Sequence, residues 1–281
     1  MASPAVQEVE VQTTSGVTVE SRRDQLAVEE PLEIRLAHGA ADEREQRSIA
    51  ITMRTPGHDA ELAAGFLLTE GIIRNRDDLE SIRPWGAMVG PQQLQNVVRV
   101  ELRPDIDVDL KRLERHFYTT SSCGVCGKTS IAALETVHAP ELLDDKPRVS
   151  AAVIHRLPRQ LRAAQAVFDR TGGLHAAGLF DAEGNLLALR EDVGRHNAVD
   201  KLIGSQLLAG NLPLLDKGII VSGRASFELM QKALMAGIPL LVAVGAPSTL
   251  AVQLAERFKM TLVGFVRDER FNTYSGAWRI G

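Results

Sequence analysis

Short apolar runs alternate with amphipathic stretches over the second half of the chain. This pattern predicts strands at residues 174–180, 186–189, 218–222, 239–244 and 261–265, and helices at 156–169, 194–208, 227–235 and 248–257. Short apolar strands joined by helices are typical of a mostly parallel sheet with helices on both faces. We therefore predict an α/β domain over residues 116–281 that is built on such a sheet.

Before residue 116 the pattern of hydrophobic and polar residues does not alternate regularly between strands and helices. It predicts strands at residues 31–37, 47–54 and 94–102, and helices at 58–69 and 107–115. Within the second strand, Ile49, Ile51 and Met53 alternate with polar or small residues. Residues 1–24 are polar and show no regular period, so we expect a flexible segment there. The predicted division is a flexible segment (1–24), a smaller α+β region (25–115) and the α/β domain (116–281).

Polar residues follow three of the predicted strands, at 222–224, 245–249 and 267–270. The carboxyl ends of parallel strands meet at one edge of a sheet, and ligands bind there in folds of this class. Arg224 beside free loop N–H groups would suit a phosphate, and Arg267 and Arg270 would suit the oxygens of a pyrophosphate. An ordinary exposed surface is the alternative, since two carboxylates separate these last two arginines.

Composition narrows the classes of protein. The chain has 281 residues, 44% of them hydrophobic, and a formal charge of -4. This charge gives no general attraction to nucleic acid or to an anionic membrane surface. No apolar run reaches the ~20 residues of a membrane span, and no signal peptide is visible near the N-terminus. We expect a cytoplasmic protein without nucleic-acid or membrane partners.

The two cysteines, Cys123 and Cys126, form one Cys-x-x-Cys motif. Glycines flank the pair, Lys128 follows it, and a helix is expected at 128–137. Nearby positive charge and a helix N-terminus both favour the thiolate, which is the nucleophilic form of cysteine. The motif therefore predicts an exposed, reactive sulfur that attacks a disulfide or persulfide, or carries a persulfide itself.

Other interpretations of the motif fit less well. A thioredoxin-like redox pair normally follows an early strand, whereas this pair lies in mid-chain. Structural zinc would need two more ligands, and His116 and His138 lack the usual spacing, so we predict no metal site. Gly127-Lys128-Thr129 ends like a phosphate-binding loop, but Ser122 replaces the first glycine of that motif.

Two further segments contain histidines. In residues 191–201, His196 and Asp200 are spaced i, i+4 on a predicted helix, so the aspartate could orient the imidazole; ordinary ion pairs at a solvated helix start are the alternative. His175 follows two glycines and fits a core histidine better than a ligand. A zinc nucleobase deaminase is excluded, because alanine stands at 177 in place of the catalytic glutamate.

Taken together, these segments resemble the FdhD family of formate dehydrogenase accessory sulfurtransferases. The resemblance is carried by residues 122–127, 171–177, 191–201, 222–228 and 262–267. The string Glu-Asp-Val-Gly-Arg-His-Asn is highly specific, whereas Cys-Gly-Val-Cys alone is not.

The resemblance implies a sulfur carrier that forms homodimers and has a cytidine-deaminase-like core. Such a protein accepts persulfide sulfur from a cysteine desulfurase. It passes the sulfur to a molybdenum or tungsten bis-pterin guanine dinucleotide cofactor before that cofactor enters formate dehydrogenase. By the family pattern Cys123 would carry the persulfide and Cys126 would assist. The positions expected to bind the cofactor, or a guanine nucleotide such as GDP in its place, are Phe265, Val266, Arg267, Asp268, Glu269, Arg270, Arg224 and His196.

Two other functions remain open from the sequence. A non-catalytic chaperone would bind the cofactor or the immature enzyme without loading sulfur on Cys123. A dithiol oxidoreductase would cycle a disulfide between Cys123 and Cys126.

Overall fold

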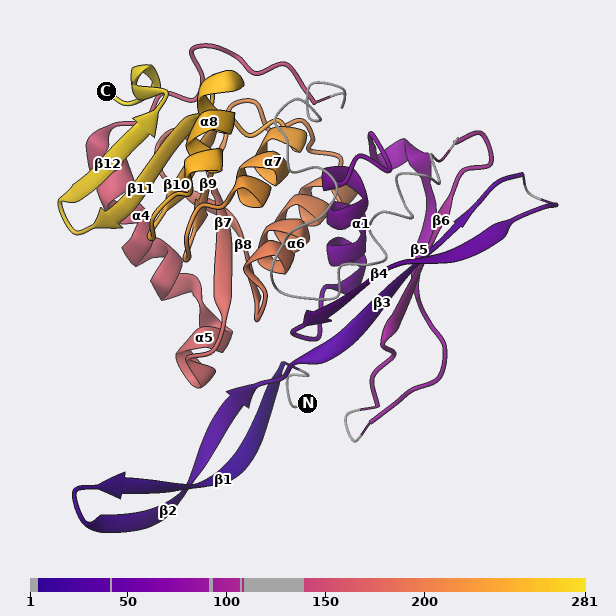
Figure 1. The fold of residues 1–281 in the computed structure, drawn as a ribbon, viewed down its shortest axis with the longest axis horizontal. Helices are drawn as coiled ribbons and strands as arrows, with labels where there is room; N and C mark the ends of the chain where they lie inside the picture. The colour runs from indigo at the N-terminus through magenta and orange to yellow at the C-terminus, as the bar shows by residue number, and fades with distance from the viewer. Residues whose placement is uncertain (1–4, 41, 91–92, 107, 109–138) are drawn as a thin grey trace.

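The computed structural model describes residues 5–40, 42–90, 93–106, 108 and 139–281 (Figure 1). Within these residues the strands form a six-stranded sheet, a four-stranded sheet and a two-stranded ribbon. Cys123, Cys126 and the helices expected at 107–115 and 128–137 lie outside the described residues, except for residue 108.

The larger sheet has the strand order β12-β11-β10-β9-β7-β8. Its strands are β7 (His175–Phe180), β8 (Leu186–Asp192), β9 (Gly218–Val221), β10 (Leu240–Ala243), β11 (Thr261–Arg267) and β12 (Arg270–Ser275), and the short helix η2 (Ala277–Arg279) follows the last. Only the pairs β9–β10 and β10–β11 are parallel, and the other three neighbouring pairs are antiparallel. The expectation of a mostly parallel sheet was wrong. Short turns join β7 to β8 and β11 to β12, and a short turn can only join antiparallel neighbours.

Helices cover both faces of this sheet, as expected. On one face, α4 (Ala151–Ala164) packs Ile154, Leu157 and Leu161 against the sheet residues Phe180 and Ile220. On the other face lie α6 (Arg195–Leu208), α7 (Phe227–Met235) and α8 (Thr249–Arg257). This second core is continuous with that of the N-terminal region.

Helix α4 begins earlier than the sequence indicated. The side chain of Ser150 accepts a hydrogen bond from the Val153 N–H at 3.3 Å and caps the helix, so Pro158 lies inside it and not at its start. The short helix α5 (Ala166–Thr171) follows and ends at Gly172.

The smaller sheet has the order β4-β3-β6-β5 and packs on one helix. Its elements are β3 (Glu30–His38), β4 (Glu45–Arg54), α1 (Asp59–Thr69), η1 (Arg76–Asp78), β5 (Leu79–Trp85) and β6 (Val97–Leu102). A register shift beside Ile34 changes the alternation along β4. Ile49 is therefore buried, while Ile51 and Met53 are exposed on the outer face, contrary to the simple alternation seen in the sequence.

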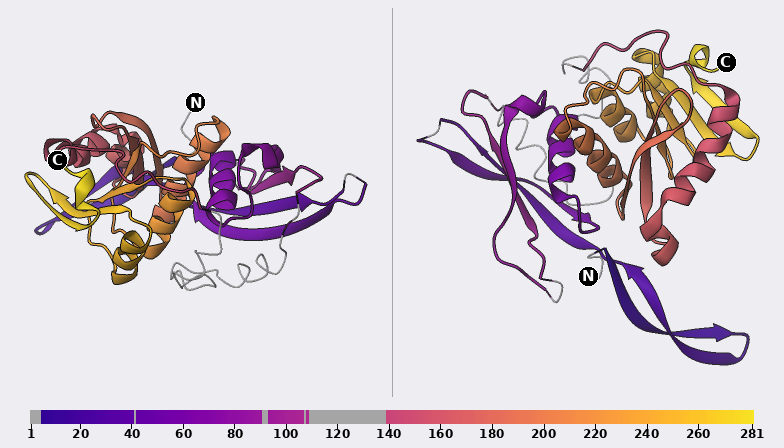
Figure 2. Two further views of the ribbon diagram at one scale, coloured as in Figure 1. Left: turned by 90° about the horizontal axis from the view of Figure 1, so that it is seen from above. Right: turned by 180° about the vertical axis from the view of Figure 1, so that it is seen from behind.

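Helices α1 and α6 cross at two glycines. A Cβ added to Gly65 would lie 1.9 Å from the backbone oxygen of Asp200, and one added to Gly204 would lie 1.8 Å from that of Glu61. No side chain fits at either position. This crossing joins the smaller sheet and its helix to the larger sheet (Figures 1 and 2).

Residues 6–27 form a β-hairpin of β1 (Val6–Ser15) and β2 (Thr18–Ala27), where a flexible segment was expected. Gly16, with φ 63°, takes the first position of the two-residue turn, which suits a hairpin. Val9, Val11 and Thr13 do alternate with polar residues, but both faces of the ribbon meet solvent. The apolar contrast that marks a half-buried strand is therefore weak.

Candidate functional site

The loop that follows β9 lies beside the start of β7. Because these strands are antiparallel, the first residue of β7, His175, is placed at the carboxyl ends of the parallel strands. Ser222 accepts a hydrogen bond on Oγ from the Ala176 N–H at 2.9 Å and donates its own N–H to the Ala176 carbonyl at 3.0 Å. A Cβ on Gly223 would lie 3.5 Å from Nδ1 of His175. This loop and the histidine thus form one edge of a site.

The three strand-end loops are hydrogen-bonded to one another in a row. The Gly245 N–H donates to the Gly223 carbonyl at 2.9 Å, and the Phe265 N–H donates to the Gly245 carbonyl at 3.1 Å. A Cβ on Gly245 would come within 3.0 Å of the Arg224 backbone nitrogen, so the loops pack closely. The predicted convergence of these loops at one edge is therefore present in the structure.

Phe265 has an unusual backbone for a bulky residue. Its φ is 54°, and it lies where the pairing between β11 and β12 shifts, between Gly264 and Arg267. A positive φ costs energy for a residue with a large side chain and is often retained at binding sites. Phe265 is 37% exposed, beside the loop of Gly245. A flat, exposed ring at this edge could stack on a planar group.

The residues after Phe265 differ in whether their side chains can reach a ligand at the site edge. Val266 is 1% exposed and packs in the core on the α4 face, so its side chain does not reach the site edge. Arg267 and Arg270 are exposed and directly opposite each other across the turn of Asp268 and Glu269. Opposite residues of an antiparallel pair share a face, so the two guanidinium groups lie on the same side. Neither has an ion pair with a carboxylate of the described residues.

Three helices begin at this same edge. Helix α8 is capped by Ser248, which accepts the Ala251 N–H at 3.2 Å, whereas the first residues of α6 and α7 have no side-chain cap. Uncapped helix N-termini present free N–H groups and partial positive charge, which favour an anion. Arg224 lies between β9 and α7 and is exposed.

His196 lies in the first turn of α6, with a 3.9 Å separation between its Nε2 and a carboxylate oxygen of Glu228. Burial lowers the pKa of His196 to about 4, with Lys232 and Arg195 contributing in the same direction. The imidazole is therefore neutral near pH 7. Its buried Nε2 and the Oγ of Ser226 have no hydrogen-bond partner among the described residues, so both could bind a polar ligand.

Asp200 does not orient His196 as the spacing allowed. It is 2% exposed and binds Lys232 at 2.8 Å and the Thr69 hydroxyl at 2.8 Å. These contacts hold α6, α7 and α1 together. Position 200 is therefore structural, because the partners of its carboxylate come from other helices.

His175 is half-buried at the same edge. Burial, followed by the positive charge of Arg195, lowers the pKa of His175. The sequence favoured a core histidine here, yet its side chain makes no hydrogen bond to a described residue. Only its position beside Gly223, on a strand that runs antiparallel to β9, shows that it borders the site.

Most of the segment 191–201 serves as a structural anchor. The carboxylate of Asp192 accepts the N–H groups of Thr55 and Gly194 and binds Lys201 Nζ at 2.7 Å. Lys201 also donates to the Thr55 carbonyl at 2.7 Å, and Asn197 donates to the Met53 carbonyl at 2.7 Å. Of this segment, Arg195 and His196 are thus the residues that remain available at the site edge.

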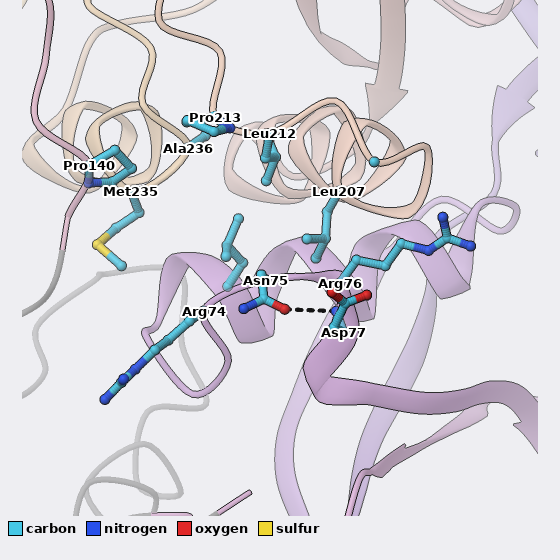
Figure 3. A pocket seen from close by; sticks show the side chains of 12 residues that line it. Arg74, Asn75, Arg76, Asp77, Pro140, Leu207, Leu212, Pro213, Met235 and Ala236 are labelled. Atoms are coloured by element: carbon cyan, nitrogen blue, oxygen red, sulfur yellow. Dashed lines mark hydrogen bonds between the residues drawn. The ribbon is translucent and has the colours of Figure 1, made fainter.

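A cavity of about 360 Å³ lies elsewhere, near the C-terminal ends of α6 and α7 (Figure 3). Leu207, Leu212 and Met235 line one side, and Arg74, on the loop before η1, and Arg76, the first residue of η1, line another. None of the predicted site residues that the structure describes lines this cavity.

The described residues contain no group of three or more His, Cys, Asp or Glu side chains arranged to hold a metal ion. Among the helices that the structure describes, none is long and apolar enough to span a membrane.

Known proteins of one family match almost the whole chain. A sulfur carrier protein FdhD of Streptomyces avermitilis is 54% identical over 265 residues, covering 93% of this chain and 91% of that protein. A protein of the same name from Mycolicibacterium paratuberculosis is 53% identical and covers 95% of this chain and 96% of its own length. The crystal structure of a candidate formate dehydrogenase accessory protein from Desulfotalea psychrophila matches 99% of this chain, with a TM-score of 0.74 and 26% identity. The model of the FdhD/NarQ family matches residues 27–281, and the chain belongs to that family.

Proposed function

We propose that this protein is a sulfur carrier in the maturation of formate dehydrogenase, with Cys123 as the residue that holds the transferred sulfur. Its curated relatives are named sulfur carrier proteins, and the related solved structure is described as a formate dehydrogenase accessory protein. The observation that supports an anionic nucleotide acceptor is the strand-end site, where arginines and uncapped helix N-termini surround closely packed glycine loops.

The proposed donor is a cysteine desulfurase and the proposed acceptor a molybdenum or tungsten bis-pterin guanine dinucleotide, which is the substrate of the transfer. Arg267, Arg270 and Arg224 would bind its phosphates, and Phe265 would stack on its guanine. His196 would offer a neutral imidazole to a polar group. Cys126 would assist Cys123, and the reaction would take place in the cytoplasm.

The sulfur step needs a cysteine that accepts a persulfide. Attack of the Cys123 thiolate on the outer sulfur of the desulfurase persulfide would form a new S–S bond. The same step would break the donor's S–S bond and return the donor cysteine as a thiolate, so no external oxidant is required. Lys128 would favour the Cys123 thiolate.

Intact-protein mass spectrometry tests this proposal. The protein is incubated with a cysteine desulfurase and free cysteine, in parallel with Cys123→Ala and Cys126→Ala. A gain of one sulfur atom that disappears only with Cys123→Ala is the expected result. No gain in any form, with a desulfurase that loads another acceptor in the same tube, would contradict it and favour a chaperone. Reduction of model disulfides by the wild type, with no sulfur gain, would indicate a dithiol oxidoreductase.

A further inference from the structure

Helix α4, on the outer side of the large sheet, has a basic exposed surface (Figure 1). Residues 146–175 contain six arginines and lysines and one acidic residue, whereas the whole chain has a formal charge of -4. On the helix itself, Arg156, Arg159 and Arg162 are exposed and spaced three residues apart, so they form one row. Positive charge gathered on one helix of a chain that is negative overall favours an anionic partner at this surface.

The three arginines differ in how far their charge is already neutralised. Arg162 pairs with Asp169 at 2.6 Å. Arg156 donates one N–H to the Glu183 carbonyl at 3.2 Å, and no carboxylate of the described residues pairs with it. Arg159 has no ion pair and no hydrogen bond to a described residue. Arg156 and Arg159 are therefore free to bind carboxylates, and neither is needed to hold the fold.

The helix runs along the sheet toward the strand-end site. Near its start, Val153 contacts Gly184 in the turn between β7 and β8, at the opposite edge of the sheet. Further along, Leu161 packs against Gly178 within β7. Helix α5 follows, and two of its N–H groups donate to the Glu191 carboxylate near the end of β8 at 2.8 and 3.0 Å. A partner bound along α4 therefore lies next to the strand-end edge.

The chemistry of the exposed helix surface indicates what kind of partner fits. Ala152 and Ala163 are exposed and continue the row of Arg156 and Arg159 at helical spacing, so a second helix can approach closely. No large apolar side chain is exposed on α4, although insertion into a membrane surface would require one. Guanidinium groups pair with carboxylates through two parallel hydrogen bonds. The surface thus fits an acidic helix with carboxylates three or four residues apart.

We infer that α4 is the docking surface for the formate dehydrogenase subunit that receives the cofactor, and that an acidic helix of this subunit binds Arg156 and Arg159. The recipient is chosen over the sulfur donor because α4 leads to the edge where the cofactor is proposed to bind. The inference rests on the proposed function, which supplies the recipient. It adds the surface on which the recipient binds and the charge that this partner must carry.

Calorimetric titration of the full-length protein with the cofactor-free catalytic subunit of formate dehydrogenase tests this surface. Arg156→Glu with Arg159→Glu is expected to raise the Kd by about 10-fold or more, because like charges then face each other. A matched control, Arg74→Glu with Arg76→Glu, changes the net charge equally at exposed residues far from α4. This control should stay within about 2-fold of wild type at physiological salt.

Two single variants test whether the contact is specific. Arg159→Ala should weaken the complex more than Arg162→Ala, because Arg162 is already paired with Asp169. Equal losses would indicate a general attraction to negative charge and would overturn the docking contact. Circular dichroism verifies folding of each variant. If the glutamate pair does not fold, Arg156→Gln with Arg159→Gln replaces it and should still weaken the complex several-fold.

Other outcomes would also overturn the inference. These are a wild-type Kd in the glutamate pair, an equal loss in the control pair, or no complex with the wild type at micromolar concentration. Binding of phosphatidylserine vesicles or duplex DNA by the wild type and not by the glutamate pair would assign α4 to a lipid or a nucleic acid instead.

Sulfur loading and GDP binding, measured on the same variants, separate this inference from the proposed function. Both should be unchanged in the glutamate pair, since α4 carries neither the cysteines nor the strand-end arginines. No sulfur gain in the wild type would contradict the proposed function. Normal sulfur gain, together with a wild-type complex in the glutamate pair, would contradict the docking surface alone.

Discussion

Charged side chains are arranged in opposite ways around helix α6 and at the carboxyl edge of the large sheet. Lys201 and Asp200 of α6 are buried and paired, the first with Asp192 at the end of β8 and the second with Lys232 of α7. At the carboxyl edge of the large sheet, Arg224, Arg267 and Arg270 are exposed and no carboxylate of the described residues is paired with them. Buried charges must be paired to be tolerated, whereas unpaired cations at strand ends remain free to bind an anion. Buried, paired charges therefore stabilise the fold, whereas the exposed, unpaired arginines are available to bind a ligand.

The largest expected effect is at the buried pair. Lys201→Met leaves the Asp192 carboxylate without its cation, and breaking a buried pair in this way costs about 3–5 kcal/mol of unfolding free energy. Urea unfolding measures this loss of unfolding free energy. The control Lys217→Met removes one side of an exposed pair with Asp216 and should cost under about 1 kcal/mol. Equal losses in the two variants would remove the distinction between buried and exposed charges.

A smaller loss is expected at the helix crossing. Gly204→Ala puts a methyl group 1.8 Å from the Glu61 backbone oxygen, so the helices must separate, at a cost of about 1–3 kcal/mol or more. The control Gly173→Ala meets its nearest atom at 3.7 Å and should change stability little. Thermal unfolding of both variants would show the difference, and an unaffected Gly204→Ala would mean that the crossing is looser than described.

At the strand-end site, loss of an exposed arginine should weaken ligand binding and leave the stability of the fold unchanged. Arg267→Ala and Arg270→Ala are each expected to weaken GDP binding about 10-fold, as for loss of a charge-assisted phosphate contact. Calorimetric titration measures this, and the melting temperature should not change. Arg257→Ala, on α8 away from the edge, is the control. Full GDP affinity in both site variants would show that the exposed arginines do not bind phosphate.

The smallest expected effect is a change at His196 in how the stability of the fold depends on pH. The pKa of His196 falls from 6.5 to about 4 on folding, because of burial, Lys232 and Arg195, which outweigh Glu228 and Glu70. Between these pH values the unfolded chain therefore binds more protons than the folded chain. This shift has no effect on the free energy of unfolding above pH 6.5 and lowers it as the pH falls toward 4. His196→Gln should flatten the fall in melting temperature from pH 7 to pH 5. The side chain is about one-third exposed, so the change will be modest, and an identical pH profile in the variant would contradict it.

Sequence patterns predicted the individual helices and strands better than they predicted which strands pair and in which direction. The alternation after residue 174 correctly placed β9, β10 and β11 and brought their polar ends to one edge. The direction of β7 could not be inferred, because it depends on pairing with β9 across an intervening strand and helix. The hairpin was missed because neither of its faces is buried.

The site residues were likewise predicted where local sequence was sufficient and missed where a role depends on distant contacts. Arg224 and Arg267 were found because they lie just after the predicted strands 218–222 and 261–265, whereas Phe265 was expected only from the family resemblance. The structural role of Asp192 was hidden, because its partner Thr55 lies 137 residues away. Val266 looked equivalent to its neighbours in the sequence, yet strand alternation turns it into the core.

The glycine crossing also sets an order of events during synthesis. Helix α1 is made early, but the surface it packs on, α6, is translated more than a hundred residues later. At typical rates of roughly 5–20 residues per second, α1 and its sheet wait on the order of ten seconds with that apolar face uncovered. The N-terminal region cannot complete its core while it emerges from the ribosome, so a chaperone that shields nascent chains would have its main client segment there.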